Sequence, residues 1–338
     1  MTRFLSGPRR TTSPRSVSIP FLFRFLSRFP LRWLHRLGTI AGWGVWLGSP
    51  SYRRVVRANL EQAFGQVDRR LLRAVIAETG RQIAELPFVW GRPQDEVLAR
   101  IVRVEGAELI ERAQAEGASV LLLTPHLGCF EMCAQYCSTH GPITVLFRPP
   151  RKPALQPLME SGRARGNIRV APADVSGVRR LVKALRGGEM VGMLPDQAPK
   201  RGEGVWTPYF GRMAWTMTLA ARLSEVKGVR VIMIWTERLP DGGGYVVHLS
   251  EPVEAIEGDL VQRCAAINRE VEHLVRACPS QYLWGYKRYK RPSGVEPPPG
   301  DAQLPNAPPE SKDGGRSGPD GRSDGGAAPT VRVAEEGR

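Results

Sequence analysis

Acidic residues are missing from the first sixty positions of this 338-residue chain, although these positions carry eleven arginines. Aromatic residues are missing from residues 292–338, which contain nine prolines and nine glycines. A basic arm of this kind is attracted to polyanions such as nucleic acid or an anionic membrane surface. A Pro- and Gly-rich segment without aromatics buries too little apolar surface to offset the entropy lost on folding. We therefore predict a disordered tail over 292–338.

Cysteine is scarce, with five in the chain, and three of them (Cys129, Cys133 and Cys137) recur at every fourth position. This spacing matches none of the common zinc signatures and is typical of buried positions on one helix face. An odd number of cysteines, without a cleavable secretory signal before them, predicts a reducing compartment and no disulfide framework. We expect neither a metal nor an organic cofactor.

Several catalytic and binding signatures are also absent. The sequence has no G-x-S-x-G elbow, no P-loop, no G-x-G-x-x-G after a strand and no H-E-x-x-H. It also lacks zinc-finger spacing, a basic region followed by heptads and an RNA-binding aromatic signature. The basic arm therefore favours a membrane surface over nucleic acid as its partner.

Residues 19–37 combine aromatic and aliphatic side chains with arginines four positions apart: Arg24, Arg28, Arg32 and Arg36. The arginines form one helical stripe that includes His35, and phenylalanines and Trp33 cover the rest. This pattern predicts a helix in a membrane interface, bent at Pro30. The uncharged run 37–52 is too short for a simple spanning helix, so we expect it to dip into the bilayer or to span it with help. The alternative for this basic segment, 1–52, is an amphipathic helix that caps a soluble core.

Residues 53–291 alternate between helical and strand-like patterns, which favours an α/β fold with a mixed, largely parallel central sheet flanked by helices. The expected helices cover about 53–63, 68–88, 106–116, 128–139, 153–165, 176–187, 213–227 and 257–277. The expected strands cover about 101–104, 119–124, 143–147, 190–194, 229–236 and 245–249. The Asp-Gly-Gly-Gly turn at 241–244 predicts an antiparallel hairpin between the last two strands.

The strongest candidate for chemistry is His126, which follows an apolar strand and the helix-breaking Pro125. At the carboxyl end of a strand, a neutral imidazole can take a proton from a hydroxyl group near pH 7. Glu131, in the first turn of the following helix, would bond the other ring nitrogen and stabilise the imidazolium. The alternative is a histidine that caps the helix beside a solvent-facing glutamate.

Asp196 and Gln197 follow another buried strand, 190–194, and should emerge at the same edge of the sheet. Asp196 would hold an arginine or a substrate hydroxyl, or would cap a turn.

Several segments, in order, resemble the bacterial lipid A late acyltransferases, the lauroyl and myristoyl transferases, within the glycerolipid acyltransferase superfamily. His126 and Glu131 resemble their H-x4-D/E motif, and Arg57, Asn59, Leu60 and Phe64 resemble R-x-N-L-x-x-x-F. Phe147-Arg148-Pro149 resembles Y-R-P, Arg163 with Gly166 resembles R-x-x-G, and 192–197 resembles the D-Q loop. Residues 205–211 resemble V-F-V-P-F-F-G, and 279–292 resemble the closing segment P-x-x-Y-L-W-x-H-R-R-F-K-x-R-P. The resemblance covers about 17–292.

The resemblance implies a membrane-bound O-acyltransferase at the cytoplasmic face of the bacterial inner membrane. It implies that acyl carrier protein is the donor and that a phosphorylated glycolipid, a lipid A precursor, is the acceptor. His126 and Glu131 would then be catalytic. Arg148 and Arg163 would bind acceptor phosphates, because guanidinium forks match phosphate oxygens. Asp196 and Gln197 would contact substrate, and backbone N–H groups near Gly128 would stabilise the oxyanion.

The sequence departs from the family pattern at three places. Gly128-Cys129-Phe130 replaces G-N-W, Gly285-Tyr286 stands where a histidine beside tryptophan is common, and residues 149–153 are unusually basic and proline-rich. These departures leave open whether the acceptor is a lipid A precursor or another lipid, such as a lysophospholipid, an amino-acid lipid or another glycolipid. A third class of function is a non-catalytic membrane-surface binding protein.

Overall fold

The computed structural model describes residues 18–148 and 156–299. The expectations for residues 1–17, for 149–155 and for the tail from 300 onward lie outside the described residues.

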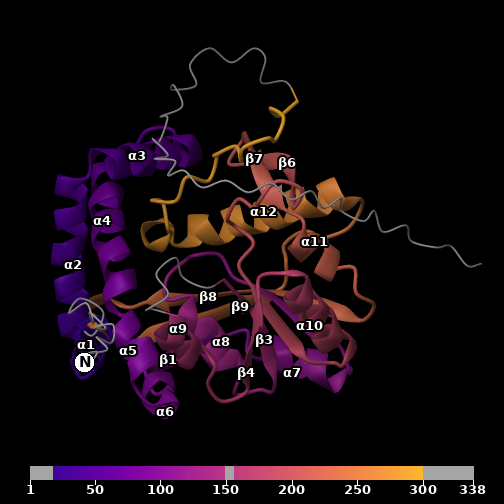
Figure 1. Cartoon of the computed structure of the whole chain (residues 1–338), viewed down its shortest axis with the longest axis horizontal. Helices are drawn as coiled ribbons and strands as arrows, with labels where there is room; N and C mark the ends of the chain where they lie inside the picture. The colour runs from indigo at the N-terminus through magenta and orange to yellow at the C-terminus, as the bar shows by residue number, and fades with distance from the viewer. Residues whose placement is uncertain (1–17, 149–155, 300–338) are drawn as a thin grey trace, which may run out of the picture. The chain divides into compact units, whose positions relative to one another are not determined.

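The centre of the fold is a seven-stranded sheet in the order β1-β9-β8-β2-β5-β3-β4 (Figure 1). Its strands are β1 (Ile101–Glu105), β2 (Ser119–Leu123), β3 (Ile143–Phe147), β4 (Ile168–Pro172), β5 (Met190–Met193), β8 (Val229–Arg238) and β9 (Tyr245–Ser250). All neighbours are parallel except β8 and β9, which form the antiparallel hairpin expected from the turn at 241–244. The predicted mixed, largely parallel sheet is confirmed, and β4 is an additional strand.

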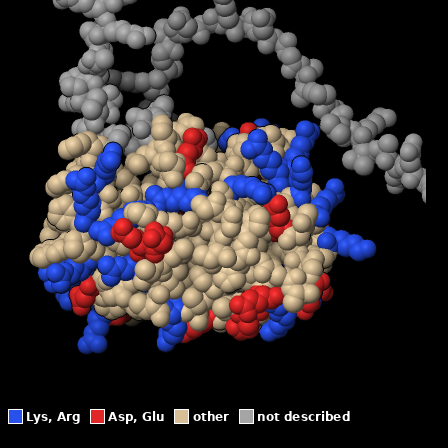
Figure 2. Space-filling view, turned by 90° about the horizontal axis from the view of Figure 1, so that it is seen from below, with Lys and Arg blue, Asp and Glu red and all other residues tan. Residues whose placement is uncertain are grey.

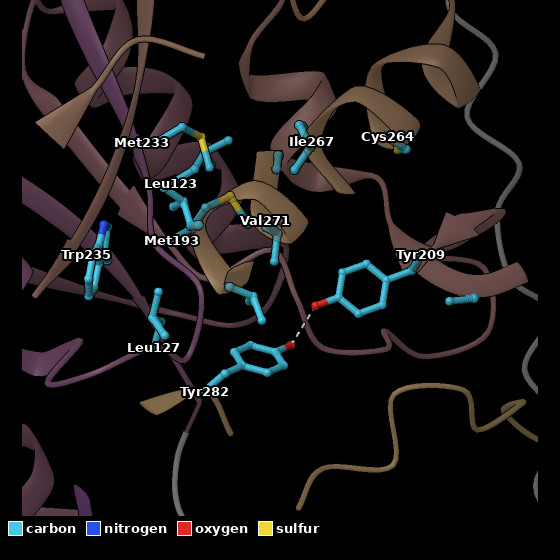
Figure 3. Packing of buried hydrophobic residues seen from close by; sticks show 14 of the residues in the cluster. Leu123, Leu127, Met193, Tyr209, Met233, Trp235, Cys264, Ile267, Val271 and Tyr282 are labelled. Carbon is cyan, nitrogen blue, oxygen red and sulfur yellow. Dashed lines mark hydrogen bonds between the residues drawn. The ribbon is translucent and has the colours of Figure 1, made fainter. Parts of the chain in front are cut away.

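Alternate residues of β2 face two hydrophobic clusters, because successive side chains of a strand point to opposite faces. Leu121 and Leu123 belong to a cluster with α10 (Val175–Arg186) and α12 (Leu260–Ala277). Val120 and Leu122 pack with α7 (Glu108–Ala115) and α8 (Glu131–Cys137). Figure 3 shows part of the first cluster, in which the hydroxyl group of Tyr209 donates to that of Tyr282 over 3.0 Å. Burial on both faces explains the uninterrupted apolar run of β2.

One predicted helix is wrong over much of its length. Residues 212–217 form β7 (Arg212–Met217), which pairs with β6 (Gly204–Tyr209) in a separate two-stranded sheet. Only α11 (Leu219–Leu223) remains of the helix expected over 213–227. The hairpin loop is Phe210-Gly211, with φ angles of 46° and 74°, a geometry suited to a two-residue turn.

Between residue 18 and the first strand, the structure has six helices: α1 (Ser18–Leu26), α2 (Leu31–Gly48), α3 (Pro50–Phe64), α4 (Arg69–Ala84), α5 (Leu86–Gly91) and α6 (Gln94–Leu98). The helix expected to bend at Pro30 is instead interrupted there, because α1 ends before Pro30 and α2 begins after it. Helices α2 and α4 lie side by side (Figure 1). Their close approach depends on glycine: a Cβ at Gly42 would lie 2.3 Å from the Ile76 carbonyl oxygen, and one at Gly80 would lie 1.9 Å from that of Gly38.

The outward face of α1 and α2 is both basic and apolar. The four arginines of the predicted stripe are exposed, and Phe21, Ile40 and Leu47 are each at least 70% exposed. His35 departs from the prediction, because it is buried between α2 and the rest of the protein and does not join the stripe. Within residues 18–148 and 156–299, no helix is both long and apolar enough to cross a bilayer.

Candidate active site

The register of two parallel strands brings His126 and Asp196 together. Leu123 of β2 is paired with Met193 of β5, and each polar residue follows its strand by three positions. The Thr124 N–H donates to the Met193 carbonyl over 3.1 Å and extends this alignment beyond the strand ends. The expectation that both residues emerge at the same sheet edge is confirmed.

Asp196 binds His126 through both carboxylate oxygens. The Nδ1 atom of His126 lies 2.7 Å from Oδ1, and the His126 backbone N–H donates to Oδ2 over 3.0 Å. Burial of Asp196 alone would raise the pKa of its carboxyl group, but its electrostatic interaction and hydrogen bonds with His126 outweigh burial and lower the pKa. Asp196 is therefore an ionised acceptor that orients the imidazole, and its partner is a histidine where the sequence suggested an arginine, a hydroxyl group or a turn.

The other ring nitrogen of His126 faces Gln197. The side-chain amide nitrogen of Gln197 lies 3.0 Å from Nε2. An amide nitrogen can only donate, so this contact requires an unprotonated Nε2 and places the ring proton on Nδ1, against Asp196. This tautomer has the free lone pair that a general base needs.

Glu131 makes its contacts elsewhere, so the predicted hydrogen bond from His126 to Glu131 is wrong. As the first residue of α8, Glu131 forms a two-pronged ion pair with Arg163 of α9 (Gln156–Arg163), in which Nε lies 3.0 Å from Oε2 and Nη2 binds Oε1. Trp90 Nε1 also donates to Oε2 over 3.2 Å. The Arg163 guanidinium in turn stacks over the rings of Trp90 and Phe147.

This ion pair changes the interpretation of the two arginines. The fork of Arg163 that would bind a phosphate is already bound to Glu131. Arg148 is exposed beside the same cavity and has no carboxylate partner among the described residues. Arg148 therefore remains the better placed of the two for an anionic substrate.

Gly128 has a conformational role in the loop after His126. Its φ angle is +58°, and a Cβ there would lie 1.9 Å from the Thr236 carbonyl oxygen. Its N–H donates to the Gln281 carbonyl, and its own carbonyl accepts from the Gln82 side chain, each over 3.1 Å. The N–H of Gly128 itself is therefore not a free oxyanion donor, because both of its backbone groups are already paired. The wider expectation of oxyanion donors near Gly128, at the start of the helix, stays a prediction.

The closing segment of the described chain supports this loop and the one after β5. Asn59 of α3 donates from Nδ2 to the carbonyls of Trp284 and Tyr286 over 2.7 and 2.8 Å. The Tyr286 hydroxyl accepts the Ala198 N–H over 3.0 Å, immediately after Gln197. Sequence reasoning noted these segments as motifs but did not assign them contacts with the site.

A cavity of about 850 Å³ is lined by His126 and by residues of β2, β3, β5 and the helices α8 to α11. Its walls are mainly apolar, from residues such as Val145, Met159 and Leu219, and its polar wall includes His126, Glu131, Arg148, Arg163 and Gln197. Such a volume lies within the range of pockets that enclose small organic ligands.

Comparison of the sequence with known proteins identifies the family. Residues 16–291 match the family model described as bacterial lipid A biosynthesis acyltransferase. The chain belongs to this family. It is 29% identical to a lipid A biosynthesis lauroyltransferase of Escherichia coli K12 over 72% of this chain and 80% of the relative. It is 28% identical to the palmitoleoyltransferase of the same strain (71% and 79% covered) and to a lipid A biosynthesis acyltransferase of Haemophilus influenzae (72% and 79%).

Family membership makes this protein an acyltransferase, and its cysteines are poor candidates for a covalent acyl intermediate. Cys133 lines the cavity, but burial raises the pKa of its thiol to about 11, so the thiolate is scarce at neutral pH. Cys129 and Cys137 are also buried, and burial raises the pKa of each.

Proposed function

We propose that this acyltransferase moves a fatty acyl chain from acyl carrier protein to a hydroxyl group of a lipid A precursor, with His126 as general base. The observation that carries the proposal is the position of His126: its Nδ1 is bound to the buried Asp196, its Nε2 faces Gln197, and both His126 and Gln197 line the 850 Å³ cavity. The names of the E. coli and H. influenzae relatives support lipid A biosynthesis.

In the proposed reaction, the acceptor hydroxyl displaces the Gln197 amide from His126 Nε2 and gives its proton to that nitrogen. The oxygen forms a bond to the thioester carbonyl carbon, and the tetrahedral intermediate then expels the carrier thiolate. The imidazolium returns the proton to this leaving sulfur, so the products are the ester and the free thiol. The ionised Asp196 stabilises the imidazolium between the two proton transfers.

Gln197 and the Glu131–Arg163 pair support this reaction from the cavity wall. The Gln197 amide is an N–H donor beside the attacking oxygen, and we assign it to the developing oxyanion. Glu131 acts as a positioning residue: it fixes the Arg163 guanidinium against Trp90, where the positive charge borders the reaction site. This role replaces the contact with His126 that the sequence suggested.

The acyl chain and the acceptor phosphate occupy different parts of the same site in this proposal. The apolar wall formed by β3, α9 and α11 suits a hydrocarbon chain, because burying each methylene contributes about 0.8 kcal/mol. The exposed Arg148 binds a phosphate of the acceptor through paired hydrogen bonds.

The carrier protein would approach over α10. Val175 and Val178 of this helix line the cavity, and Arg179, Lys183 and Arg186 are exposed on it. Arg180 is exposed on the same helix. None of these four basic residues forms an ion pair within the described chain, so all four can bind an acidic partner. On the face seen from below in Figure 2, basic and acidic side chains are interspersed with uncharged surface.

The exposed face of α1 and α2 would hold the enzyme on the cytoplasmic surface of the inner membrane. Large apolar side chains such as Phe21, Ile40 and Leu47 face outward beside the arginine stripe. Each apolar side chain favours the lipid interface, and each arginine near anionic lipid contributes about 1 kcal/mol.

The test is mass spectrometry of lipids made by the purified, full-length enzyme from acyl carrier protein thioester and a panel of acceptors. The panel holds a lipid A precursor, a lysophospholipid, an amino-acid lipid and another glycolipid. His126→Ala should lower the rate by at least 10²–10⁴-fold without unfolding the protein, and Glu131→Gln should also be severely impaired. A His126→Ala enzyme that works at the wild-type rate would refute the mechanism, and acylation of only another lipid would replace the proposed acceptor.

A further inference from the structure

A buried ion-pair cluster lies behind the His126 loop, outside the cavity. Arg238 and Glu85 are each about 1–2% exposed and form a two-pronged pair, with Arg238 Nε donating to Glu85 Oε2 over 2.7 Å. The remaining terminal nitrogen of Arg238 donates to Glu78 of α4, also over 2.7 Å. Neither Arg238 nor either carboxylate lines the cavity, so the proposed reaction does not use them directly.

The cluster reaches α2 through His35. The Nε2 of this buried histidine lies 3.3 Å from Glu85 Oε2, which also accepts the Tyr245 hydroxyl over 3.1 Å. The glycine contacts between α2 and α4 hold the two helices close enough for this bond. His35 therefore connects the helix that carries the exposed apolar face to the interior of the enzyme.

The same cluster reaches the catalytic loop through Gln281. The Arg238 N–H donates to Gln281 Oε1 over 2.9 Å, and Gln281 Nε2 donates back to the Arg238 carbonyl over 2.8 Å. The Gln281 backbone carbonyl then accepts the Gly128 N–H, and Gln82 of α4 holds the Gly128 carbonyl. Two positions further along the chain, the Leu283 N–H donates to the His126 carbonyl over 3.0 Å.

We propose that His35, Glu85, Arg238 and Gln281 form a positioning network that couples α2 to the loop carrying His126, and that this coupling sets kcat. The inference rests on the proposed function, because it assigns the network a role in aligning the general base. Its physical basis is that buried charges and amides tolerate few alternative arrangements, so each member fixes the next. The N-terminal helices then act in catalysis as well as in membrane attachment.

A network that only stabilises the fold would behave differently from one that positions the base. Removing a positioning contact lowers kcat and leaves KM unchanged, since the substrates still bind the same cavity. A small displacement of a catalytic group can cost up to about 100-fold in rate. Loss of stability alone lowers the unfolding temperature and leaves the kcat of the folded enzyme unchanged.

The experiment compares His35→Leu with His35→Gln in the full-length enzyme. The leucine variant removes the bond to Glu85, whereas a glutamine amide can restore a donor. We expect His35→Leu to lower kcat roughly 10- to 100-fold at unchanged KM, and His35→Gln to recover most of the loss. His273→Leu, on the exposed face of α12, is the matched control and should leave kcat unchanged.

Hydrogen exchange measured by mass spectrometry gives a readout that does not depend on the reaction. In His35→Leu and in Gln281→Met, the amides of 127–130 should exchange faster, while those of β2 stay protected. The methionine variant keeps the side-chain length, and it replaces His35→Leu as the test variant if His35→Leu does not fold.

If His35→Leu and Gln281→Met leave both kcat and the exchange of amides 127–130 unchanged, while His126→Ala is inactive, the positioning network is refuted and the proposed function still stands. A fully active His126→Ala enzyme would refute the proposed mechanism, and with it the role of the network in kcat.

Discussion

Replacing Asp196 by asparagine removes one charge and one hydrogen-bond acceptor at the centre of the site. In the wild-type protein, Oδ1 lies 2.7 Å from His126 Nδ1, and Oδ2 accepts the His126 backbone N–H over 3.0 Å. Asparagine has only one oxygen, so its amide nitrogen must face one of these two groups.

Both orientations of the asparagine impair the base. If the amide nitrogen faces Nδ1, it donates to that atom, and the ring proton moves to Nε2, which can then no longer accept the acceptor's proton. If the amide nitrogen faces the backbone N–H of His126, two donors meet and the loop must shift. The first orientation resembles the tautomer error of a serine triad that lacks its aspartate, which predicts a loss in kcat of roughly 10³–10⁴-fold, or about 4–5 kcal/mol in the activation barrier.

The substitution also changes how stability depends on pH. The pKa of Asp196 is lowered in the folded protein, so its ionised form stabilises the fold above the pKa of the unfolded chain. This contribution is lost as the pH falls through the lowered folded value. The difference in unfolding free energy between wild type and variant should therefore be largest near neutral pH and should shrink in strong acid.

The assay is acyl transfer to the lipid A precursor at saturating donor, with thermal unfolding measured on the same samples. Asp259→Asn is the matched control, because Asp259 caps α12 in an exposed position and asparagine caps helices equally well. An Asp196→Asn enzyme that retains kcat within tenfold of the wild type, while staying folded, would show that Asp196 does not set the tautomer of His126.

Three further predictions concern binding, membrane attachment and acid stability. Arg148→Ala should raise KM for a phosphorylated acceptor roughly 10- to 100-fold with little change in unfolding temperature; equal KM values in Arg148→Ala and in the remote control Arg230→Ala would contradict it. Ile40→Glu should weaken cosedimentation with anionic vesicles by roughly tenfold or more. Val253→Glu is the control, because Val253 is equally exposed on another surface, and it should leave cosedimentation unchanged. Equal cosedimentation of the two variants would contradict membrane binding through the face of α1 and α2. The pKa of Glu85 is lowered to about 2, because the charge and hydrogen bonds of its partners outweigh burial. The free energy of unfolding, followed by circular dichroism, should therefore fall as the pH drops from about 4.5 to about 2, and no loss in that window would refute the assignment.

The test of membrane attachment uses point substitutions because α2 is part of the folded core. Gly38 and Gly42 pack directly on α4, and His35 binds Glu85. The sequence suggested that 1–52 form a membrane-associated segment separate from the α/β fold of 53–291. Deleting it would expose the apolar face of α4 and leave Glu85 without one of its donors, so loss of membrane binding could not be separated from unfolding.

The sequence by itself determined the fold class and the edge of the sheet where the site lies. Buried strands leave uninterrupted apolar runs, and Pro125 and Pro195 end two of them just before His126 and Asp196. The hairpin at 241–244 could also be predicted from the sequence, because the residues that form its turn are adjacent in the chain. The β6–β7 hairpin was missed because the pattern around Trp215 fits a helix as well as a strand, and pairing with β6 decided between them.

Only the tertiary structure decided which charged groups meet. His126 and Glu131 are close in sequence, yet His126 binds Asp196 across a strand register and Glu131 binds Arg163 on α9. A spacing of five residues limits how far apart two side chains can lie, but it does not determine the directions in which they point. Backbone hydrogen bonds between paired strands, by contrast, determine which residues of the two strands lie next to each other. The pairing of buried charges depends on elements that are far apart along the chain, and for that reason no local pattern contained it.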